Sequence, residues 1–186
     1  MGGTLARVFV PGRGEGRLIT EPVGPGERRT VLKITSQDAD GEEYWLWGSR
    51  LDAATLDARE AWNESYYRQR EKRRETTLDE PGVIDIPSGI HLLRRRPPTE
   101  PLELELWTDG KIYPVLIEPG RKEQRQVDGR TTIVDHFVIE GRDVPDRRVW
   151  KGRLDVWLTP DEAAVPVEIV YRRKGGKVHL DLVPPE

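Results

Sequence analysis

Apolar and polar residues alternate along most of this chain, most clearly near its C-terminal end. In the run 153–158, the residues Leu154, Val156 and Leu158 alternate with polar residues and Trp157. The runs 165–173 and 177–183 alternate in the same way. Because successive side chains of a strand point to opposite faces, this pattern predicts three antiparallel strands with one apolar and one mostly polar face.

Two residue pairs predict tight hairpins and, with them, the register of the strands. Gly175-Gly176 and Asp109-Gly110 each suit a two-residue turn in which both central residues have positive φ. Residues that directly oppose each other across such a hairpin share a face of the sheet. The opposed pairs that these turns predict are Tyr171 with Leu180, Ile169 with Leu182, Leu106 with Tyr113 and Leu104 with Val115.

Segment 49–78 allows two interpretations. It has helix-forming Arg, Glu and Lys residues but no apolar stripe of period 3.6, and the adjacent Tyr66 and Tyr67 could not share a helix face. We therefore favour two polar, exposed strands and keep a helix as the alternative. The other ranges expected to be strands are 5–10, 17–21, 28–36, 43–47, 102–108, 111–118, 123–127 and 131–140.

One helix is expected, between Asp85 and Pro98. Pro87 suits a first helical position, and Arg94–Arg96 complement the negative end of the helix dipole. Pro97-Pro98 prevents continuation. The chain is thus expected to be mainly β, with a single curved antiparallel sheet, a half-barrel of about ten strands, closed by one short α-helix. We expect one domain over residues 1–186.

Composition narrows the class of partner. The 186 residues include 30 basic and 33 acidic side chains, a net charge of −3, so the surface carries both signs and nucleic acid is not an expected partner. The basic cluster Arg68–Arg74 is interleaved with Glu71, as in a solvated strand face. No apolar run approaches the roughly 18 residues of a membrane span. The absence of cysteine excludes disulfides and thiol chemistry.

The chain shows no recognisable catalytic or metal motif. The three histidines His91, His136 and His179 lack the local spacing of metal ligands, and no serine lies in a nucleophile elbow. We therefore expect no enzyme, no cofactor and no metal. An enzyme would need a cleft that brings a histidine and a carboxylate from separate strands within hydrogen-bond reach.

Aromatic residues are the feature that suggests a ligand. Several tryptophans lie on alternating strands, some on the face opposite the main apolar rows. A sheet that is apolar on both faces needs two covering layers or a ligand. Either the helix and segment 49–78 cover this second face, or it forms a concave pocket for an acyl chain. The candidate ligand-binding residues are Trp45, Trp47, Trp107, Ile112 and Trp157.

Two stretches carry a family resemblance. Asp85–Arg94 is followed by the Asp-Gly-Lys-x-Tyr turn of Leu104–Tyr113, and Leu154–Asp161 is followed by Pro166-Val167 and the Gly-Gly hairpin. In order and spacing, residues 50–183 resemble the bacterial domain-of-unknown-function 3108 family. The resemblance implies a half-barrel like that of lipoprotein carriers, a periplasmic or cell-envelope location, and no agreed catalytic residues.

The resemblance leaves two functions open. One is a non-enzymatic envelope domain that binds a lipid, a lipoprotein or another hydrophobic ligand on the concave face of the half-barrel. The other is a scaffold or protein-interaction module that pairs with an envelope protein through a strand edge. The export signal typical of the family is not recognisable at Met1–Thr4, so a cytoplasmic location is the alternative.

Overall fold

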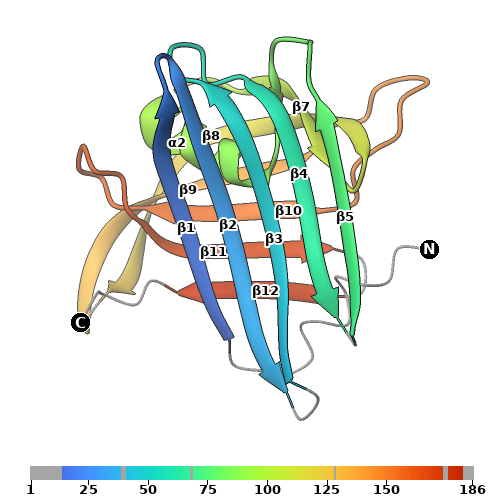
Figure 1. The fold of residues 1–186 in the computed structure, drawn as a ribbon. Helices are drawn as coiled ribbons and strands as arrows, with labels where there is room; N and C mark the ends of the chain where they lie inside the picture. Colours follow the sequence, from blue (N-terminus) through green and yellow to red (C-terminus); the bar gives the residue numbers. More distant parts are fainter. Residues whose placement is uncertain (1–13, 39–40, 68, 128, 174–175, 182–186) are drawn as a thin grey trace. The chain divides into compact units, whose positions relative to one another are not determined.

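The computed structural model describes residues 14–38, 41–67, 69–127, 129–173 and 176–181, and the strand expected at 5–10 lies outside them. Within the described residues the chain forms twelve strands and one α-helix (Figure 1). Their bounds are β1 Gly14–Gly24, β2 Glu27–Asp38, β3 Gly41–Asp52, β4 Ala58–Tyr67, β5 Arg70–Thr77, β6 Val83–Ile84, α2 Ile86–Arg95, β7 Leu102–Thr108, β8 Lys111–Val127, β9 Arg130–Gly141, β10 Arg153–Leu158, β11 Pro166–Arg173 and β12 Gly176–Asp181.

The strands form two sheets, so the prediction of one sheet of about ten strands was wrong. Strands β1 to β5 lie side by side in chain order, and a curled, half-barrel sheet has the order β12-β11-β10-β9-β8-β7-β6 (Figure 1). The mainly β class, the short helix and the half-barrel are confirmed. Strand β5 explains the break: its residues 70–75 are all charged and exposed, so they offer no apolar side chain to a further strand.

By contacts, the chain divides into two compact units. Among the described residues, the first unit comprises those from 14 to 92 together with Leu104–Tyr113, and the second comprises Leu93–Glu103 together with those from 114 to 181. The single-domain expectation stays a prediction.

Segment 49–78 forms strands and not a helix, as favoured, but only β5 is exposed, whereas most residues of β4 are buried or half-buried. The end of β3, then β4 and then β5 form an antiparallel meander in which Ser49 opposes Ala61 and Ala61 opposes Thr76. The connection between β3 and β4 is held by Asp52, whose Oδ1 accepts hydrogen bonds from the backbone N–H groups of Ala54 and Thr55 at 2.8 and 3.0 Å.

The predicted helix is present and begins with a reciprocal cap. The backbone N–H of Ser88 donates to Asp85 Oδ1 at 2.9 Å, and the backbone N–H of Asp85 donates to Ser88 Oγ at 2.7 Å. These two bonds satisfy donors that a helix N-terminus leaves open. Pro87 lies at the second helical position, one later than expected but still within the first turn, where its missing N–H has no effect.

The register of the last hairpin differs from the prediction by two residues. Tyr171 opposes Val178, and Ile169 opposes Leu180. The two connecting residues are therefore 174–175, which lie outside the described residues, and not Gly175-Gly176. Because side chains alternate with period two, a shift of two residues leaves the predicted faces unchanged. At the other hairpin Asp109 (φ 53°) and Gly110 (φ 75°) form the expected turn.

Strand β8 runs without a break where two strands were expected. Its pairing with β9 is irregular between Glu118 and Arg121, so a bulge takes the place of the predicted loop. Gly120 lies in this bulge, and a Cβ there would come within 2.8 Å of the Phe137 ring. A glycine is therefore required for the ring to lie against the backbone at this point.

Candidate functional site

On the central strands β2 and β3, one face of the five-stranded sheet is apolar and shielded from solvent; we call it the buried face. In the pairing of β2 with β3, Ile34 opposes Trp45 and Leu32 opposes Trp47. All four side chains are at most 6% exposed. Since directly opposed residues share a face, the two tryptophans lie side by side with aliphatic neighbours.

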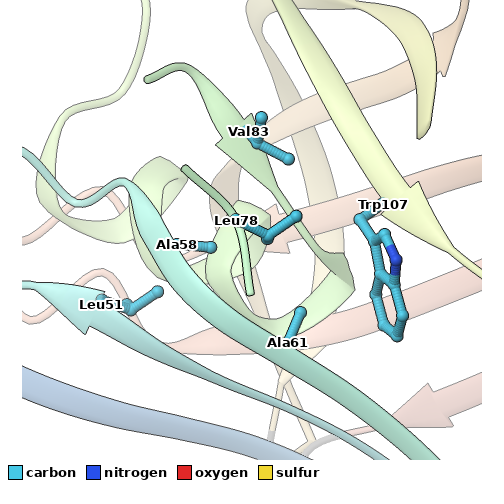
Figure 2. Packing of buried hydrophobic residues seen from close by; sticks show 6 residues of the cluster. All are labelled: Leu51, Ala58, Ala61, Leu78, Val83 and Trp107. Atoms are coloured by element: carbon cyan, nitrogen blue, oxygen red, sulfur yellow. The ribbon is translucent and has the colours of Figure 1, made fainter. Parts of the chain in front are cut away.

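One end of the buried face is closed by other segments of the first unit. Leu78, Val83 and Trp107 pack there with residues of β3 and β4 (Figure 2). Ser49, on the same face of β3, donates through Oγ to Asp85 Oδ1 at 2.9 Å. This bond fixes the start of α2 against β3. The complete apolar cluster is Leu51, Ala58, Ala61, Leu78, Val83 and Trp107.

Two buried polar atoms beside Trp45 lack hydrogen-bond partners within the described residues. They are the indole Nε1 of Trp47, a donor, and the Oδ1 of Asn63, an acceptor. Trp47 and Asn63 directly oppose each other in the pairing of β3 with β4. A buried polar atom without a partner is unfavourable by about 1–3 kcal/mol, so a bound group that both accepts and donates would stabilise this part of the face.

Asp85 is a third partly satisfied group in the first unit. Its Oδ1 accepts bonds from Ser49 and Ser88, whereas its Oδ2 is buried without a partner in the described part of the chain. Burial raises the pKa of Asp85 to about 6, although its hydrogen bonds with Ser88 and Ser49 act in the opposite direction. The carboxyl group therefore changes charge near neutral pH.

The structure brings together only part of the predicted ligand-binding set. Trp45, Trp47 and Trp107 belong to the first unit and are buried there. Ile112 also belongs to the first unit but is 39% exposed. Trp157 belongs to the second unit, where it packs in a separate cluster with Val134, Val167 and Val170.

Around Trp157 the second unit holds a network of ionic groups. His136 stacks on Trp157, with 4.2 Å between ring centroids and 5° between planes. Its Nδ1 lies 2.8 Å from Glu123 Oε1 and its Nε2 lies 2.9 Å from Asp155 Oδ1. The Trp157 indole N–H donates to Glu123 Oε2 at 2.9 Å, and the Arg125 guanidinium lies 4.6 Å from the Trp157 ring centroid.

The two carboxylates of this network are held in their ionised form. The hydrogen bond from Trp157 lowers the pKa of Glu123, and the bond from His136 adds to it. Burial acts to raise the pKa of Asp155, but the hydrogen bonds from Arg153 and His136 outweigh it, so the pKa lies below its usual range. Arg172 also pairs with Asp155. These strong local pairs are those of a structural ion network.

The geometry gives His136 no free nitrogen for catalysis. Both ring nitrogens are engaged by carboxylates, so neither is available to abstract a proton or to bind a metal. Glu123 and Asp155 lie on opposite nitrogens of the ring and do not converge on one point. No cluster of three or more His, Asp or Glu side chains that could hold a metal ion occurs among the residues that the structure describes.

The sequence did not predict that Asn63, Ser49 and Asp85 belong to the candidate site of the first unit. Asp85 was identified only as the start of the helix, and Asn63 lies in the segment whose structure the sequence left open. Its position opposite Trp47 follows from the register of β3 and β4. The position of Asn63 opposite Trp47 could therefore be recognised only once the strand pairing was known.

Comparisons with known proteins identify no similar protein. A scan of protein-family models and searches of curated proteins and of solved structures find no match to this chain. The resemblance of residues 50–183 to the domain-of-unknown-function 3108 family therefore stays a prediction. Among the described residues, no helix is long and apolar enough to span a membrane.

Proposed function

We propose that this protein is a non-enzymatic binding domain of the bacterial envelope, and that the buried face of its five-stranded sheet holds a hydrophobic ligand with a polar end. The observation that carries the proposal is the pair of unpartnered atoms, Trp47 Nε1 and Asn63 Oδ1, on directly opposed residues. They lie among apolar side chains, so they would accept the polar end of an otherwise apolar molecule. Envelope location rests on the family resemblance.

The chemistry of the face favours an acyl chain with a small head group. Leu32, Ile34 and Trp45 offer aliphatic and aromatic contact for a chain. A protonated carboxylic acid, an alcohol or an amide can accept a bond from Trp47 and donate one to Asn63. A pure hydrocarbon would leave both atoms unpaired.

Fluorescence titration tests the proposal. The probe is 11-(dansylamino)undecanoic acid, with undecanoic acid as the competitor. We expect saturable binding in the micromolar range, about −8 kcal/mol, together with quenching of tryptophan emission. Trp47→Phe keeps the aromatic bulk but removes the donor, and should weaken binding by roughly five-fold, about 1 kcal/mol.

Trp62→Phe is the matched control. Trp62 lies on β4, directly opposite Gly48, and so on the other face of the same sheet. It should leave probe affinity unchanged. Absence of saturable binding, or an equal loss of affinity in both variants, would contradict the proposal.

A further inference from the structure

The second face of the five-stranded sheet carries an unusual set of side chains; we call it the exposed face. A row of opposed residues crosses four strands, from Ile19 to Val31 to Gly48 to Trp62. Ile19 is 51% exposed, and Val31 and Trp62 are half-buried. Apolar side chains so placed on a solvated face are more than the alternation of a half-exposed strand requires.

Trp62 lies flat on this face because Gly48 has no side chain. A Cβ on Gly48 would lie 2.4 Å from the Trp62 ring atoms Cε2 and Cζ2. The guanidinium of Arg29 lies 5.7 Å from the Trp62 ring centroid and also pairs with Glu21 at 3.7 Å. The indole is therefore held in one position before any partner arrives, which lowers the entropy lost on binding.

Two tyrosines extend the aromatic surface along β3 and β4. Tyr44 and Tyr66 directly oppose each other and stack, with 6.1 Å between ring centroids. The Tyr44 hydroxyl donates to Glu64 Oε1 at 2.7 Å, and this bond raises the pKa of Tyr44 to about 12. Leu46 lies on the same face, between Tyr44 and Gly48 along β3. Trp, Tyr and Arg are the residues that most often dominate binding energy at protein interfaces.

Several arginines of this face lie in ion pairs, whereas Lys33 and Glu71 have none among the described residues. Arg50 pairs with Glu60, and Arg73 pairs with Glu64 and Glu75. Lys33 lies 5.1 Å from the Tyr44 ring centroid and has no ion pair among the described residues. It is therefore the position at which an acidic group of a partner would find a counter-charge.

We propose that the exposed face is a docking surface for a single segment of another protein, one that carries apolar side chains beside an aspartate or a glutamate. The apolar side chains would lie on Trp62, Val31 and Ile19, and the carboxylate on Lys33. This surface lies on the face opposite the proposed ligand, so it does not depend on ligand binding.

The size and composition of the surface argue for this occupant. Four strands at about 4.8 Å spacing and five residues along a strand give roughly 15 by 14 Å. A stable dimer buries about 800 Å² per partner, several times this area, so a second copy of the chain fits poorly.

Peptide display tests the proposal. A library of random 12-residue peptides is selected on the whole protein, and the affinity of synthetic copies is measured by fluorescence anisotropy. We expect selected peptides to combine apolar residues with Asp or Glu. Lys33→Glu should weaken their binding roughly ten-fold or more, the scale of one charge pair. A library selected on Lys33→Glu should instead be enriched in Lys and Arg.

Lys72→Glu is the matched control, because Lys72 opposes Ser65 on the same sheet and so lies on the other face. It should change peptide affinity by less than two-fold. Selected peptides that bind equally well to the wild type and to Lys33→Glu would overturn the proposal. So would a dimer in light scattering that Lys33→Glu dissociates, or glycan-array binding that Trp62→Phe abolishes.

Discussion

At the scale of single residues, glycines under aromatic rings recur in both units. In the first unit Trp62 lies on Gly48, and in the second unit Trp150 lies against Gly152. At each glycine an added Cβ would come within 2.4 Å of the ring. The ring then covers backbone that a side chain would otherwise cover, as aromatic residues commonly do beside glycines in strands.

The first prediction concerns Gly48→Ala. The new methyl group would push the Trp62 ring off the strand, and we expect the unfolding free energy to fall by about 1–3 kcal/mol. Tryptophan emission should shift to the red as the indole becomes more exposed. Urea denaturation followed by fluorescence measures both effects. Gly24→Ala is the control, because its Cβ would meet only Glu27 Oε2 at 3.8 Å, and it should be nearly neutral.

A second prediction concerns the buried Asp85. Its folded pKa of about 6 is higher than its ordinary value of 3.8, so the folded state binds the extra proton between these values. The contribution of Asp85 to the unfolding free energy is therefore fully present below about pH 4 and is lost as the pH rises through about 6. The loss at neutral pH is on the order of 3 kcal/mol.

Asp85→Asn tests this sign. An amide can still accept from Ser88 and Ser49, but it does not titrate. The unfolding free energy of the variant, minus that of the wild type, should rise between pH 4 and pH 7.5. Paired urea titrations at five pH values measure the difference. A difference that is constant over this range would show that Asp85 does not titrate near pH 6.

At the scale of elements, ionic side chains link the strands of the second unit. Asp155 on β10 is 2% exposed at its side chain and receives bonds from His136 on β9 and Arg172 on β11. Arg125 on β8 pairs with Glu168 on β11 at 2.9 Å. These bonds cross strand boundaries on one face, so they reinforce the backbone ladder.

A third prediction compares two aspartates of the second unit. Asp155→Asn removes the charge that neutralises Arg153 and Arg172, and should lower the unfolding free energy at pH 7 by about 3 kcal/mol. Asp135→Asn removes only the pair with Lys122, which is 64% exposed at its side chain, and should change it by less than about 1 kcal/mol. Equal effects would show that burial does not strengthen this network.

Asp155 also gives a pH test, in which stability should change with pH in the opposite direction to that expected for Asp85. Because the folded pKa of Asp155 is lowered, its contribution is present above the unfolded value and is lost as pH falls through the folded one. Wild-type stability should therefore decrease below about pH 4 more steeply than that of Asp155→Asn. Acid denaturation followed by circular dichroism measures the two slopes, and parallel slopes would contradict the assignment.

Sequence patterns within one segment predicted single strands such as β7 well. The position of the candidate site depends on strand pairing, which these patterns did not predict. Strand β7 matches the predicted range 102–108, because its alternation ends at an Asp-Gly turn. The connection from β3 to β4 could not be predicted, since Leu56 has a φ of 68°, a value that side chains other than glycine rarely adopt. That turn sets Asn63 opposite Trp47, and with it the candidate site.

At the scale of the whole molecule, three elements contribute residues to both units. The boundary between the units falls within α2, within β7 and within β8. Because these elements belong to both units, we expect the two units to unfold together. Within the part of the chain that the structure describes, the two units are thus continuous at three places.

A fourth prediction follows from this continuity. Urea unfolding should give one transition, with the same midpoint by far-UV circular dichroism and by tryptophan fluorescence. The six tryptophans of the chain make the fluorescence sensitive to both units. Two separated midpoints would contradict the single domain predicted from the sequence.

Strand β5 is an edge strand of the five-stranded sheet, and its charged side chains disfavour pairing with the same strand of another molecule. Its charged residues, from Arg70 to Glu75, would have to lose their hydration before another sheet could be added there. Fibres that grow by adding sheets edge to edge require both edge strands of the sheet to pair with strands of other molecules. The molecule can therefore be kept at high concentration with little tendency to form fibres by this route.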